Sequence, residues 1–329
     1  MRKRSLVTDA ILHVIASLES GGAERQLALL ATEQARRGMQ VHLAVRRRGP
    51  LEAMLQGVHI HELADLAGAD LRLVWQLVRF VRTFAPTIVQ TWLPQMDVLG
   101  GSAALATRVP WVMTERSTDY PRDAALFARN TIGRLASAIV ANSVEGAAGW
   151  RDAHVIPNAV VVDHPVPTEP PTVVFAGRLD DNKQPHVFVD AIARTRLPAI
   201  VFGDGPLRGA LESRARDLPI KFAGYRADWH RWLASAIAFV TPSRREGEPN
   251  AVLEALAFGR PVIASDIAAH RHLVEPAFAV GDVDGLVRAL ASPRFTSRVD
   301  LANRSLAVTA DRYDAVYTSV SARSRARRT

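Results

Sequence analysis

One strand–turn–helix–strand segment, residues 236–264, most constrains how this chain can fold. It opens with an apolar run at 236–240 that predicts a buried strand. A turn through Gly247 then leads into a helix with apolar periodicity, for which Asn250 is a suitable N-cap. A second short apolar run follows at 262–264. The segment predicts a parallel sheet, with the backbone amides at the helix start turned toward an anion.

Two carboxylates of this segment, Glu246 and Glu254, are separated by seven residues. In one interpretation, Glu246 is a charge on a loop and Glu254 lies on a solvated helix face. In the other, they point into a cleft at the carboxyl end of a parallel sheet, where ligands of open α/β sheets bind. The two residues alone do not decide between these interpretations.

The ordered string around the two carboxylates decides between them. It reads Ser243-x-x-Glu246-Gly247-x-Pro249-Asn250-x-x-x-Glu254-Ala255, then Gly259-x-Pro261-Val262-Ile263-Ala264-Ser265-Asp266. This string resembles the signature of the family 4 retaining glycosyltransferases, which are nucleotide-sugar enzymes of the GT-B fold. The resemblance implies that Glu246 contacts the donor sugar and that Glu254 holds the ribose hydroxyls. Glu248 departs from the pattern, since the family has an aromatic or aliphatic residue there.

Two further segments share the resemblance. Gly177-Arg178-Leu179 follows a strand predicted at 172–176, and Lys183 lies five positions after Arg178. Exposed cations at this spacing are ordinarily just solvated, but here they resemble the family's diphosphate grip. Two fixed cations and a helix N-terminus stabilise the charge on a departing diphosphate. The turn at 20–24, Ser-Gly-Gly-Ala-Glu, resembles the phosphate-facing loop of the same enzymes, although a bare Gly-Gly pair is usually only a turn.

The resemblance therefore implies a metal-independent site that uses a UDP- or GDP-linked sugar as co-substrate and needs no cofactor. The predicted catalytic residues are Glu246, Arg178 and Lys183. The predicted donor-binding residues are Gly21, Gly22, Gly177, Gly247, Pro249, Asn250, Ala251, Glu254, Tyr225 and Arg226. Glu115 and Arg116 follow a strand predicted at 110–113 and are candidates for the acceptor side, with a solvated loop as the equal alternative.

Several residues are predicted to have structural roles. The family often carries a histidine where this chain has Thr91 and Trp92, so that role is not transferred. The Gly-x-Gly-Pro turn at 203–206 is taken as structural. The acidic pair around Val283 is expected to favour a helix N-terminus. His270 and His272 are expected to serve a neutral hydrogen-bonding role rather than bind a metal, since no third ligand is in sight.

Length and composition fit a globular chain with two domains. The 329 residues are 48% hydrophobic and 22% charged, and no apolar run is long enough to span a bilayer. Cysteine is absent, which excludes a disulfide framework and fits the cytoplasm. The net charge of +8 comes almost entirely from arginine. The default interpretation of this charge is a compositional bias, and the functional alternative is attraction to anionic donors or to an anionic membrane. No sequence motif supports binding to nucleic acid.

The predicted fold is α/β, of GT-B type, with two Rossmann-like doubly wound domains facing a central cleft. The expected boundaries are an N-terminal acceptor-side domain at 1–164, a proline-rich linker at 165–171 and a nucleotide-sugar-binding domain at 172–329. The last helix is expected to cross back to the first domain.

Some local expectations accompany this division. The apolar run at 11–16 predicts a first buried strand rather than a signal peptide. A helix is predicted at 71–84, with Trp75, Val78 and Val81 in the core. The chain from 292 onward is expected to be helical, and the arginine-rich tail at 323–328 is expected to be disordered.

The leading hypothesis is a retaining transferase that moves a sugar from a nucleotide diphosphate to a hydroxyl of a carbohydrate or lipid-linked acceptor. Polysaccharide, lipopolysaccharide or glycolipid assembly is its expected context. The expected location is cytoplasmic, with peripheral contact at the inner membrane face left open. The alternatives are a nucleotide-sugar 2-epimerase of the same fold and a non-catalytic module that binds sugar nucleotides.

Overall fold

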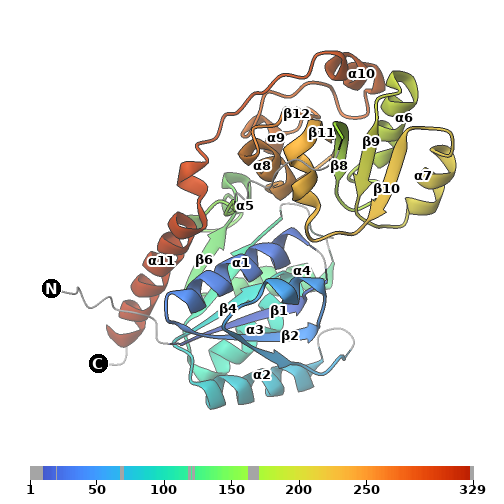
Figure 1. The fold of residues 1–329 in the computed structure, drawn as a ribbon. Coiled ribbons are helices and arrows are strands. Elements are labelled where there is room, and N and C mark those ends of the chain that lie inside the picture. Colours follow the sequence, from blue (N-terminus) through green and yellow to red (C-terminus); the bar gives the residue numbers. More distant parts are fainter. Residues whose placement is uncertain are drawn as a thin grey trace. The chain divides into compact units, whose positions relative to one another are not determined.

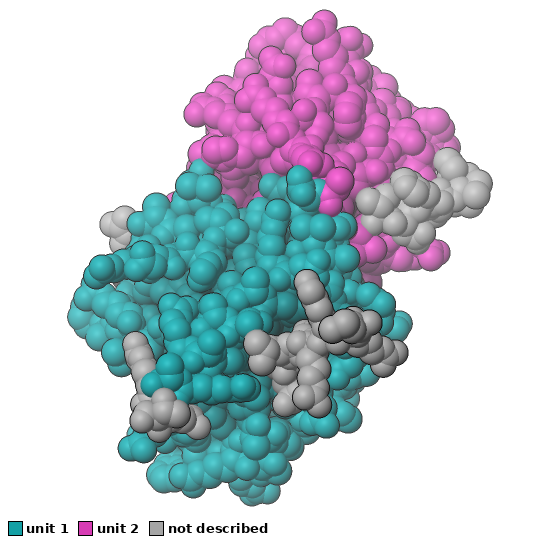
Figure 2. All heavy atoms as spheres, turned by 90° about the vertical axis from the view of Figure 1, so that its left-hand side faces the viewer, with its two compact units in different colours: residues 1–159, 303–329 teal, residues 160–302 magenta. Residues whose placement is uncertain are grey.

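The computed structural model describes residues 10–19, 21–66, 70–117, 120, 123–161 and 170–326. Contacts divide the chain into two units, shown in different colours in Figure 2. Unit 1 comprises residues 1–159 and 303–329, and unit 2 comprises residues 160–302. Most of the linker predicted at 165–171 lies outside the described residues. The second unit thus ends at Ala302, and the last helix belongs to unit 1.

Unit 1 is built on a sheet of seven parallel strands in the order β3-β2-β1-β4-β5-β6-β7. The order reverses between β1 and β4, as in a doubly wound fold. The strands are β1 (Ala10–Ser17), β2 (Gln40–Arg47), β3 (Val58–Glu62), β4 (Ile88–Trp92), β5 (Trp111–Glu115), β6 (Ala138–Ala141) and β7 (His154–Val155).

Helices cover both faces of this sheet, which explains why its central strands read as continuous apolar runs. On β1, Ile11 and Ile15 pack in one core and Leu12 and Val14 pack in the other, because successive side chains alternate between faces. The first core is covered by α1 (Gly22–Arg36), the 3-10 helix η1 (Pro50–Met54) and α11 (Leu306–Ala326). The second is covered by α2 (Leu71–Phe84), α3 (Pro94–Thr107) and α4 (Ala124–Gly133); the short α5 is Val144–Ala147.

Unit 2 repeats the design with five parallel strands in the order β10-β9-β8-β11-β12. They are β8 (Thr172–Ala176), β9 (Ala199–Phe202), β10 (Ile220–Gly224), β11 (Ala236–Thr241) and β12 (Val262–Ala264). One face packs on α6 (Pro185–Thr195), α7 (Arg208–Arg214) and α10 (Val283–Ala291), and the other on η2 (Trp229–Ser235) and α8 (Asn250–Ala257). The helix α9 is Ala268–Arg271, and η3 is Ala302–Arg304. Two Rossmann-like α/β units are therefore confirmed.

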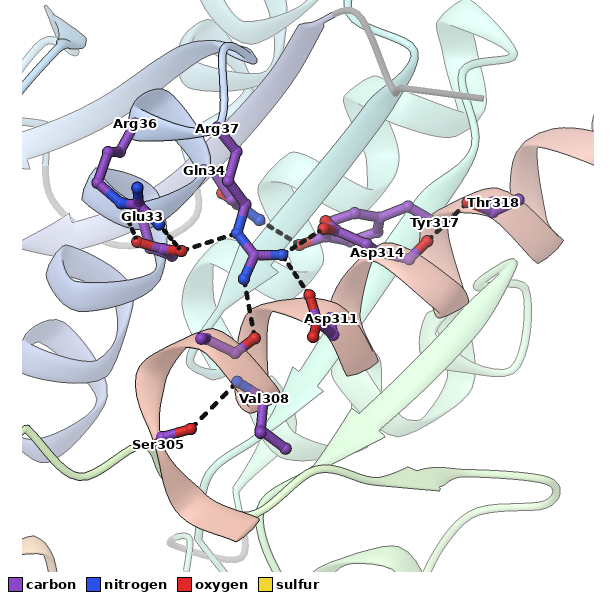
Figure 3. A network of polar contacts seen from close by, with 11 residues as sticks. Glu33, Gln34, Arg36, Arg37, Ser305, Val308, Asp311, Asp314, Tyr317 and Thr318 are labelled. Carbon is purple, nitrogen blue, oxygen red and sulfur yellow. Dashed lines mark hydrogen bonds and ion pairs between the residues drawn. The ribbon is translucent and has the colours of Figure 1, made fainter. Parts of the chain in front are cut away.

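The helix α11 packs against α1, and the two helices are neighbours in Figure 1. Arg37, at the end of α1, donates to Asp311 at 2.6 Å, to Asp314 at 3.0 Å and to the carbonyl oxygen of Ala307 at 2.9 Å (Figure 3). Deeper in the interface, Gln34 Nε2 donates to the hydroxyl of the buried Tyr317 at 3.1 Å. These contacts complete the core of unit 1 with residues from the end of the described chain.

Three local expectations were wrong. Trp75 is 72% exposed, although Val78 and Val81 are buried as predicted. Successive steps of three residues fall short of a full helical turn, so Trp75 drifts about 120° around the helix from Val81. The helix expected from 292 begins only at Leu306, and it continues through Ala326 into the tail expected to be disordered. Residues 327–329 lie outside the described part.

Among the residues that the structure describes, no helix combines the length and the apolar character that crossing a bilayer requires.

The buried His13 on β1 is held in one neutral tautomer. Its Nε2–H donates to Gln34 Oε1 at 2.8 Å, and its Nδ1 accepts from Trp92 Nε1–H at 3.2 Å. Burial lowers the pKa of His13 to about 4, and the hydrogen bond to Gln34 offsets this only in part. Protonating Nδ1 would set two donors, His13 and Trp92, against each other in the core.

We expect His13 to make stability fall as the pH drops. An unfolded histidine binds a proton near pH 6.5, whereas folded His13 does so only near pH 4, so acid favours the unfolded chain between these values. The free energy of unfolding should fall by up to about 3 kcal/mol over this window. Urea unfolding at pH 7 and pH 4.5 measures the loss, which should shrink in His13→Gln and persist in the control His154→Gln, which changes an exposed histidine on β7. Equal pH dependence in all three proteins would contradict this account.

Candidate active site

Two loops meet at the switch point of unit 2, where the strand order reverses between β8 and β11. The loop at 177–184 follows β8, and the loop at 242–249 follows β11. The backbone N–H of Arg244 donates to the carbonyl oxygen of Asn182 at 2.8 Å, and Asn182 Nδ2 donates to the carbonyl oxygen of Arg245 at 3.0 Å. Such a position, beyond the carboxyl ends of the strands, is where open α/β sheets bind ligands.

The ion pair between Lys183 and Glu246 joins the two loops. The Glu246 side chain is only 12% exposed, and its Oε1 also accepts from the Ser243 hydroxyl at 2.8 Å. Burial alone would raise the pKa of Glu246, but the Lys183 ammonium and the Ser243 hydroxyl more than offset it and hold this pKa below its usual range. Glu246 is therefore a carboxylate at neutral pH, able to accept hydrogen bonds from hydroxyl groups.

A second tier of hydrogen bonds supports the loop that carries Glu246. The Ser265 hydroxyl donates to the carbonyl oxygen of Ser243 at 2.6 Å, and the Nδ1–H of His270 donates to the carbonyl oxygen of Ser265 at 2.8 Å. His270 is completely buried, and burial lowers its pKa. The hydrogen-bonding role predicted for His270 is confirmed.

Arg178 lies on the same loop as Lys183 but extends into solvent. Its side chain is 73% exposed, and its Nε lies 3.5 Å from Asp180 Oδ2. Asp180 in turn accepts from the backbone N–H of Lys183 at 3.0 Å, which fixes the turn between the two cations. The loop thus presents one exposed cation and one that is tied to Glu246.

The glycine turn after β9 packs against the loop at 177–184. A Cβ atom on Gly203 would lie 1.9 Å from the carbonyl oxygen of Gly177, and the φ of Gly203 is +121°. A Cβ atom on Gly205 would lie 2.5 Å from the carbonyl oxygen of Leu179. Backbone hydrogen bonds run from Leu179 N–H to the carbonyl oxygen of Asp204 at 2.9 Å, and from Gly177 N–H to that of Phe202 at 3.0 Å. The structural role predicted for the turn at 203–206 is confirmed.

The helix α8 starts as predicted, except at its cap. Pro249 occupies the N-cap position without a side-chain hydrogen bond, and Asn250 is the first helical residue rather than the cap. Proline at the cap has no N–H to satisfy, and its extended ψ of 103° ends the preceding turn. Glu254 lies in the second turn of α8, and its side chain is buried. Gly247 and Ala251 flank the cap on either side.

Tyr225 and Arg226 follow the edge strand β10, two strands away from β8 in the sheet. Tyr225 is 40% exposed. Arg226 pairs with Asp228 at 2.9 Å, and its guanidinium lies 4.7 Å from the ring centroid of Trp232. These contacts hold Arg226 against η2.

In unit 1, Gly21 caps the start of α1, and Gly22 is its first residue. This helix begins after β1, at the switch point of its own sheet. A Cβ atom on Gly21 would lie 2.1 Å from Oε2 of Glu24, so the glycine leaves room for that carboxylate. Burial raises the pKa of Glu24. The helix start therefore already faces a carboxyl group of the chain itself.

The candidate acceptor-side residues Glu115 and Arg116 lie at the end of β5, and both are buried. Arg116 Nη2 donates to Asn158 Oδ1 at 2.5 Å, and its guanidinium lies 5.3 Å from the ring centroid of Trp92. Glu115 pairs with Arg129, whose Nη1 donates to it at 2.8 Å.

Sequence reasoning missed the cluster around Arg129. Arg129 Nε donates to Asp97 Oδ2 at 2.7 Å, and Asp97 Oδ1 accepts from the Thr91 hydroxyl at 2.6 Å. Trp111 Nε1 donates to the Thr91 oxygen at 2.9 Å. Thr91 and Trp92 are thus core residues of unit 1. Asp97 lies in the first turn of a helix and Arg129 in the next helix, positions where acids and bases are ordinarily solvated.

Asp282 is the N-cap of α10 and accepts from the backbone N–H of Gly285 at 2.9 Å. This agrees with the prediction that the acidic pair at 282 and 284 favours a helix N-terminus.

Comparison with known proteins agrees with the geometry. Residues 20–169 match the profile described as Glycosyltransferase Family 4, and residues 170–293 match that of Glycosyl transferases group 1. The chain belongs to the family 4, group 1 glycosyltransferases. Together the two matches extend over both units, so the family resemblance proposed from the sequence is confirmed.

Three similar proteins illustrate this glycosyltransferase family. The lipopolysaccharide core biosynthesis glycosyltransferase LpsE of Rhizobium meliloti is 27% identical over 83% of this chain and 85% of its own length. A GDP-mannose-dependent phosphatidylinositol dimannoside mannosyltransferase of Mycobacterium tuberculosis is 36% identical over 31% of this chain and 29% of its own. The structure of Anabaena HepE in complex with UDP-glucose aligns with a TM-score of 0.75 and 20% identity, over 96% of this chain and 98% of that one. The GT-B fold is confirmed.

We expect Gly203→Ala to destabilise the loop that carries Arg178 and Lys183. The added methyl group meets the Gly177 carbonyl, and the positive φ disfavours any side chain. The free energy of unfolding should fall by about 1–3 kcal/mol. Gly209→Ala is the matched control, because its Cβ meets nothing within 4 Å. Urea unfolding measures both; equal stability of the two variants would show that the turn does not support the loop.

Proposed function

We propose that this glycosyltransferase moves a sugar from a nucleotide diphosphate donor to a hydroxyl of an acceptor, with retention of configuration at the anomeric carbon. The ion pair between Lys183 and Glu246 at the switch point of unit 2 carries the proposal. It places a cation and an ionised carboxylate where a ligand of this fold would bind. A sugar diphosphate needs both kinds of group, one for its phosphates and one for its hydroxyls.

Arg178 and Lys183 are assigned to the diphosphate. When the bond between the anomeric carbon and the phosphate oxygen breaks, its electron pair stays on the diphosphate, and fixed cations stabilise this charge. In the structure Lys183 is paired with Glu246 and Arg178 extends into solvent. Donor binding would therefore bring a new anion to a loop on which Lys183 is already held in place and Arg178 is exposed.

Glu246 is assigned to the hydroxyls of the donor sugar, and Glu254 to those of the ribose. Gly247 and Pro249 lead into α8, and the backbone N–H groups of Asn250 and Ala251 lie in its first turn, where a helix N-terminus favours a negatively charged ligand. Gly177 belongs to the diphosphate loop, and Tyr225 and Arg226 are assigned to the nucleobase. In unit 1, Gly21 and Gly22 are assigned to the phosphates. No metal or other cofactor is part of this scheme.

Retention follows from a front-face mechanism. The anomeric carbon loses its bond to the phosphate oxygen and gains one to the acceptor oxygen on the same face. The acceptor proton passes to the departing phosphate oxygen, so the protein itself supplies no base. Glu246 is tied to Lys183 and Ser243, an arrangement that suits holding a hydroxyl better than attacking carbon.

The pathway proposed is assembly of a cell-surface glycan such as lipopolysaccharide, at the cytoplasmic side of the membrane. The support is the name of the relative that matches most of this chain, a lipopolysaccharide core biosynthesis glycosyltransferase. The donor is UDP- or GDP-linked, the two kinds of donor that appear in the names of the similar proteins.

We expect nucleotide release from one member of a panel of UDP-, GDP- and ADP-sugars, first without acceptor. Lys183→Ala and Glu246→Gln should slow release by about 10²–10³-fold, because each removes a preorganised group. The control Lys221→Ala changes an exposed lysine on β10 and should release nucleotide at the wild-type rate.

The products separate the alternatives. With an acceptor present, the proton coupling at the anomeric carbon should match that of the donor if configuration is retained. Sugar interconversion without nucleotide release would instead favour a 2-epimerase. Failure of every donor to react or to protect the protein against heat would favour a non-catalytic module.

We also propose peripheral contact with an anionic membrane through α2. The basic termini that suggested this contact lie mostly outside the described residues. On α2, however, Leu71 and Trp75 are 74% and 72% exposed, and Arg72, Arg79 and Arg82 are exposed on the same side. These five residues lie within about 100° of one another around the helix, on the face opposite the core. Tryptophan and arginine on one exposed helix face suit an anionic lipid surface.

We expect the protein to sediment with phosphatidylglycerol vesicles at low salt and not with phosphatidylcholine vesicles. Trp75→Ser should weaken this binding severalfold, because it removes the largest apolar side chain of the exposed face of α2. Phe295→Ser, which alters a half-exposed aromatic of unit 2, should not. Absence of wild-type binding, or equal loss in both variants, would refute this contact.

A further inference from the structure

One histidine behind the candidate donor site has a ring nitrogen without a partner. His270, on the short helix α9, is completely buried. Its Nδ1–H donates to the carbonyl oxygen of Ser265 at 2.8 Å, which leaves Nε2 as a hydrogen-bond acceptor. This Nε2 is itself buried and has no hydrogen-bond partner among the described residues. A buried polar atom without a partner calls for an explanation.

Two serines connect His270 to Glu246. The Ser265 hydroxyl donates to the carbonyl oxygen of Ser243 at 2.6 Å. The Ser243 hydroxyl in turn donates to Glu246 Oε1 at 2.8 Å. All four residues belong to unit 2, so this arrangement is a property of that unit alone. His270 is thus linked, residue by residue, to the carboxylate that is assigned to the donor sugar.

The two charges of the ion pair act on His270 in opposite directions. Burial lowers the pKa of His270, and its hydrogen bond to a backbone carbonyl opposes this effect. The Glu246 carboxylate also raises this pKa, whereas the Lys183 ammonium lowers it. His270 is therefore neutral at pH 7 as long as Lys183 and Glu246 are paired.

The other charged groups on the segment of His270 have little influence on its protonation. Asp266 and Arg271 form an ion pair at 2.6 Å, so their charges offset each other. His272 is exposed, and solvent screens its charge. The protonation of His270 therefore depends mainly on the ion pair in the two loops.

Donor binding would change the charge around this ion pair. A sugar nucleotide carries a diphosphate with two negative charges, and Lys183 is assigned to it in the proposed function. Lys183 would then have to compensate the diphosphate as well as Glu246. The Glu246 side chain is only 12% exposed, and a carboxylate in such a place is costly when its cation is shared with another anion.

We propose that His270 takes up a proton at Nε2 when the donor diphosphate binds, so that a histidinium replaces Lys183 as the counter-charge of Glu246. The proton comes from the solvent, and no bond of the donor is made or broken in this step. His270 is thus a positioning residue, because it acts on the sugar through Glu246, which it keeps ionised. The inference rests on the proposed function, since it requires that Lys183 turn to the diphosphate.

This proton uptake links donor affinity to pH. The protein with bound donor holds a proton on His270 that the donor-free protein lacks, so acid favours the complex. Donor affinity should therefore rise as the pH falls through the window between the lowered pKa of free His270 and its higher pKa in the complex. The diphosphate of a sugar nucleotide remains doubly charged throughout this window.

The first test is a histidine NMR titration of the full chain without donor. The His270 signals are identified by their loss in His270→Asn, whose amide N–H can still donate to the Ser265 carbonyl. The titration midpoint of His270 should move up by about one pH unit or more in Lys183→Met, and down in Glu246→Gln. The control Lys221→Met removes an exposed lysine of β10 and should leave the midpoint unchanged.

The second test is titration calorimetry with UDP-glucose, GDP-mannose and ADP-glucose, at pH 6, in buffers of different ionisation enthalpy. Binding should take up protons in the wild type and in the control His272→Gln, but not in His270→Asn. Between pH 7.5 and pH 5.5, the Kd of the wild type should fall by up to about tenfold per pH unit. A purely structural role of His270 would instead weaken binding in His270→Asn by the same factor at every pH.

Two results would overturn the inference: the midpoint of His270 stays the same in Lys183→Met, or a donor binds to the wild type without proton uptake. Thermal melting confirms that each variant is folded. Because the NMR titration uses no donor, its failure leaves nucleotide release by Lys183 and Glu246 untouched. Conversely, if none of the donors binds, the proposed function is refuted and this inference with it, even where the midpoint moves in Lys183→Met.

Discussion

The candidate site depends on one half-buried ion pair, between the Lys183 ammonium and the Glu246 carboxylate. The two residues come from different loops, one after β8 and the other after β11. The pair therefore exists only because these two strands are neighbours where the strand order reverses. Hydrogen bonds and close backbone contacts hold both loops in position. Ser243, Ser265 and His270 hold one loop, and the glycines at 203 and 205 let the backbone of β9 approach the other. The sheet order thus sets the chemistry that unit 2 can offer.

The sequence was informative where local pattern and burial coincide. Strands buried on both faces appear as apolar runs, so Thr172–Ala176 and Val262–Ala264 were predicted to the residue. The string that ends at Glu254 identified the family because its order is specific. Local pattern failed for Trp75, since an apolar residue on a helix can face solvent when its neighbours fill the core.

No local sequence pattern indicates the contacts between residues that are far apart in the chain. Arg129 meets Asp97 across 32 residues, and His13 meets Gln34 across 21 and Trp92 across 79. Each residue alone fits a solvated helix or an ordinary strand, and only the fold reveals that it is buried and paired.

The return of α11 to unit 1 has a consequence for biosynthesis. Unit 2 is an insertion between two segments that share one core, and Tyr317 completes that core against Gln34. On the ribosome, the first segment must wait until all of unit 2 has emerged, with the part of its core that α11 covers still exposed. Unit 2 is contiguous and can fold first, whereas unit 1 closes only when its last helix arrives. The interval between these events is when this chain would be most exposed to aggregation or to chaperones.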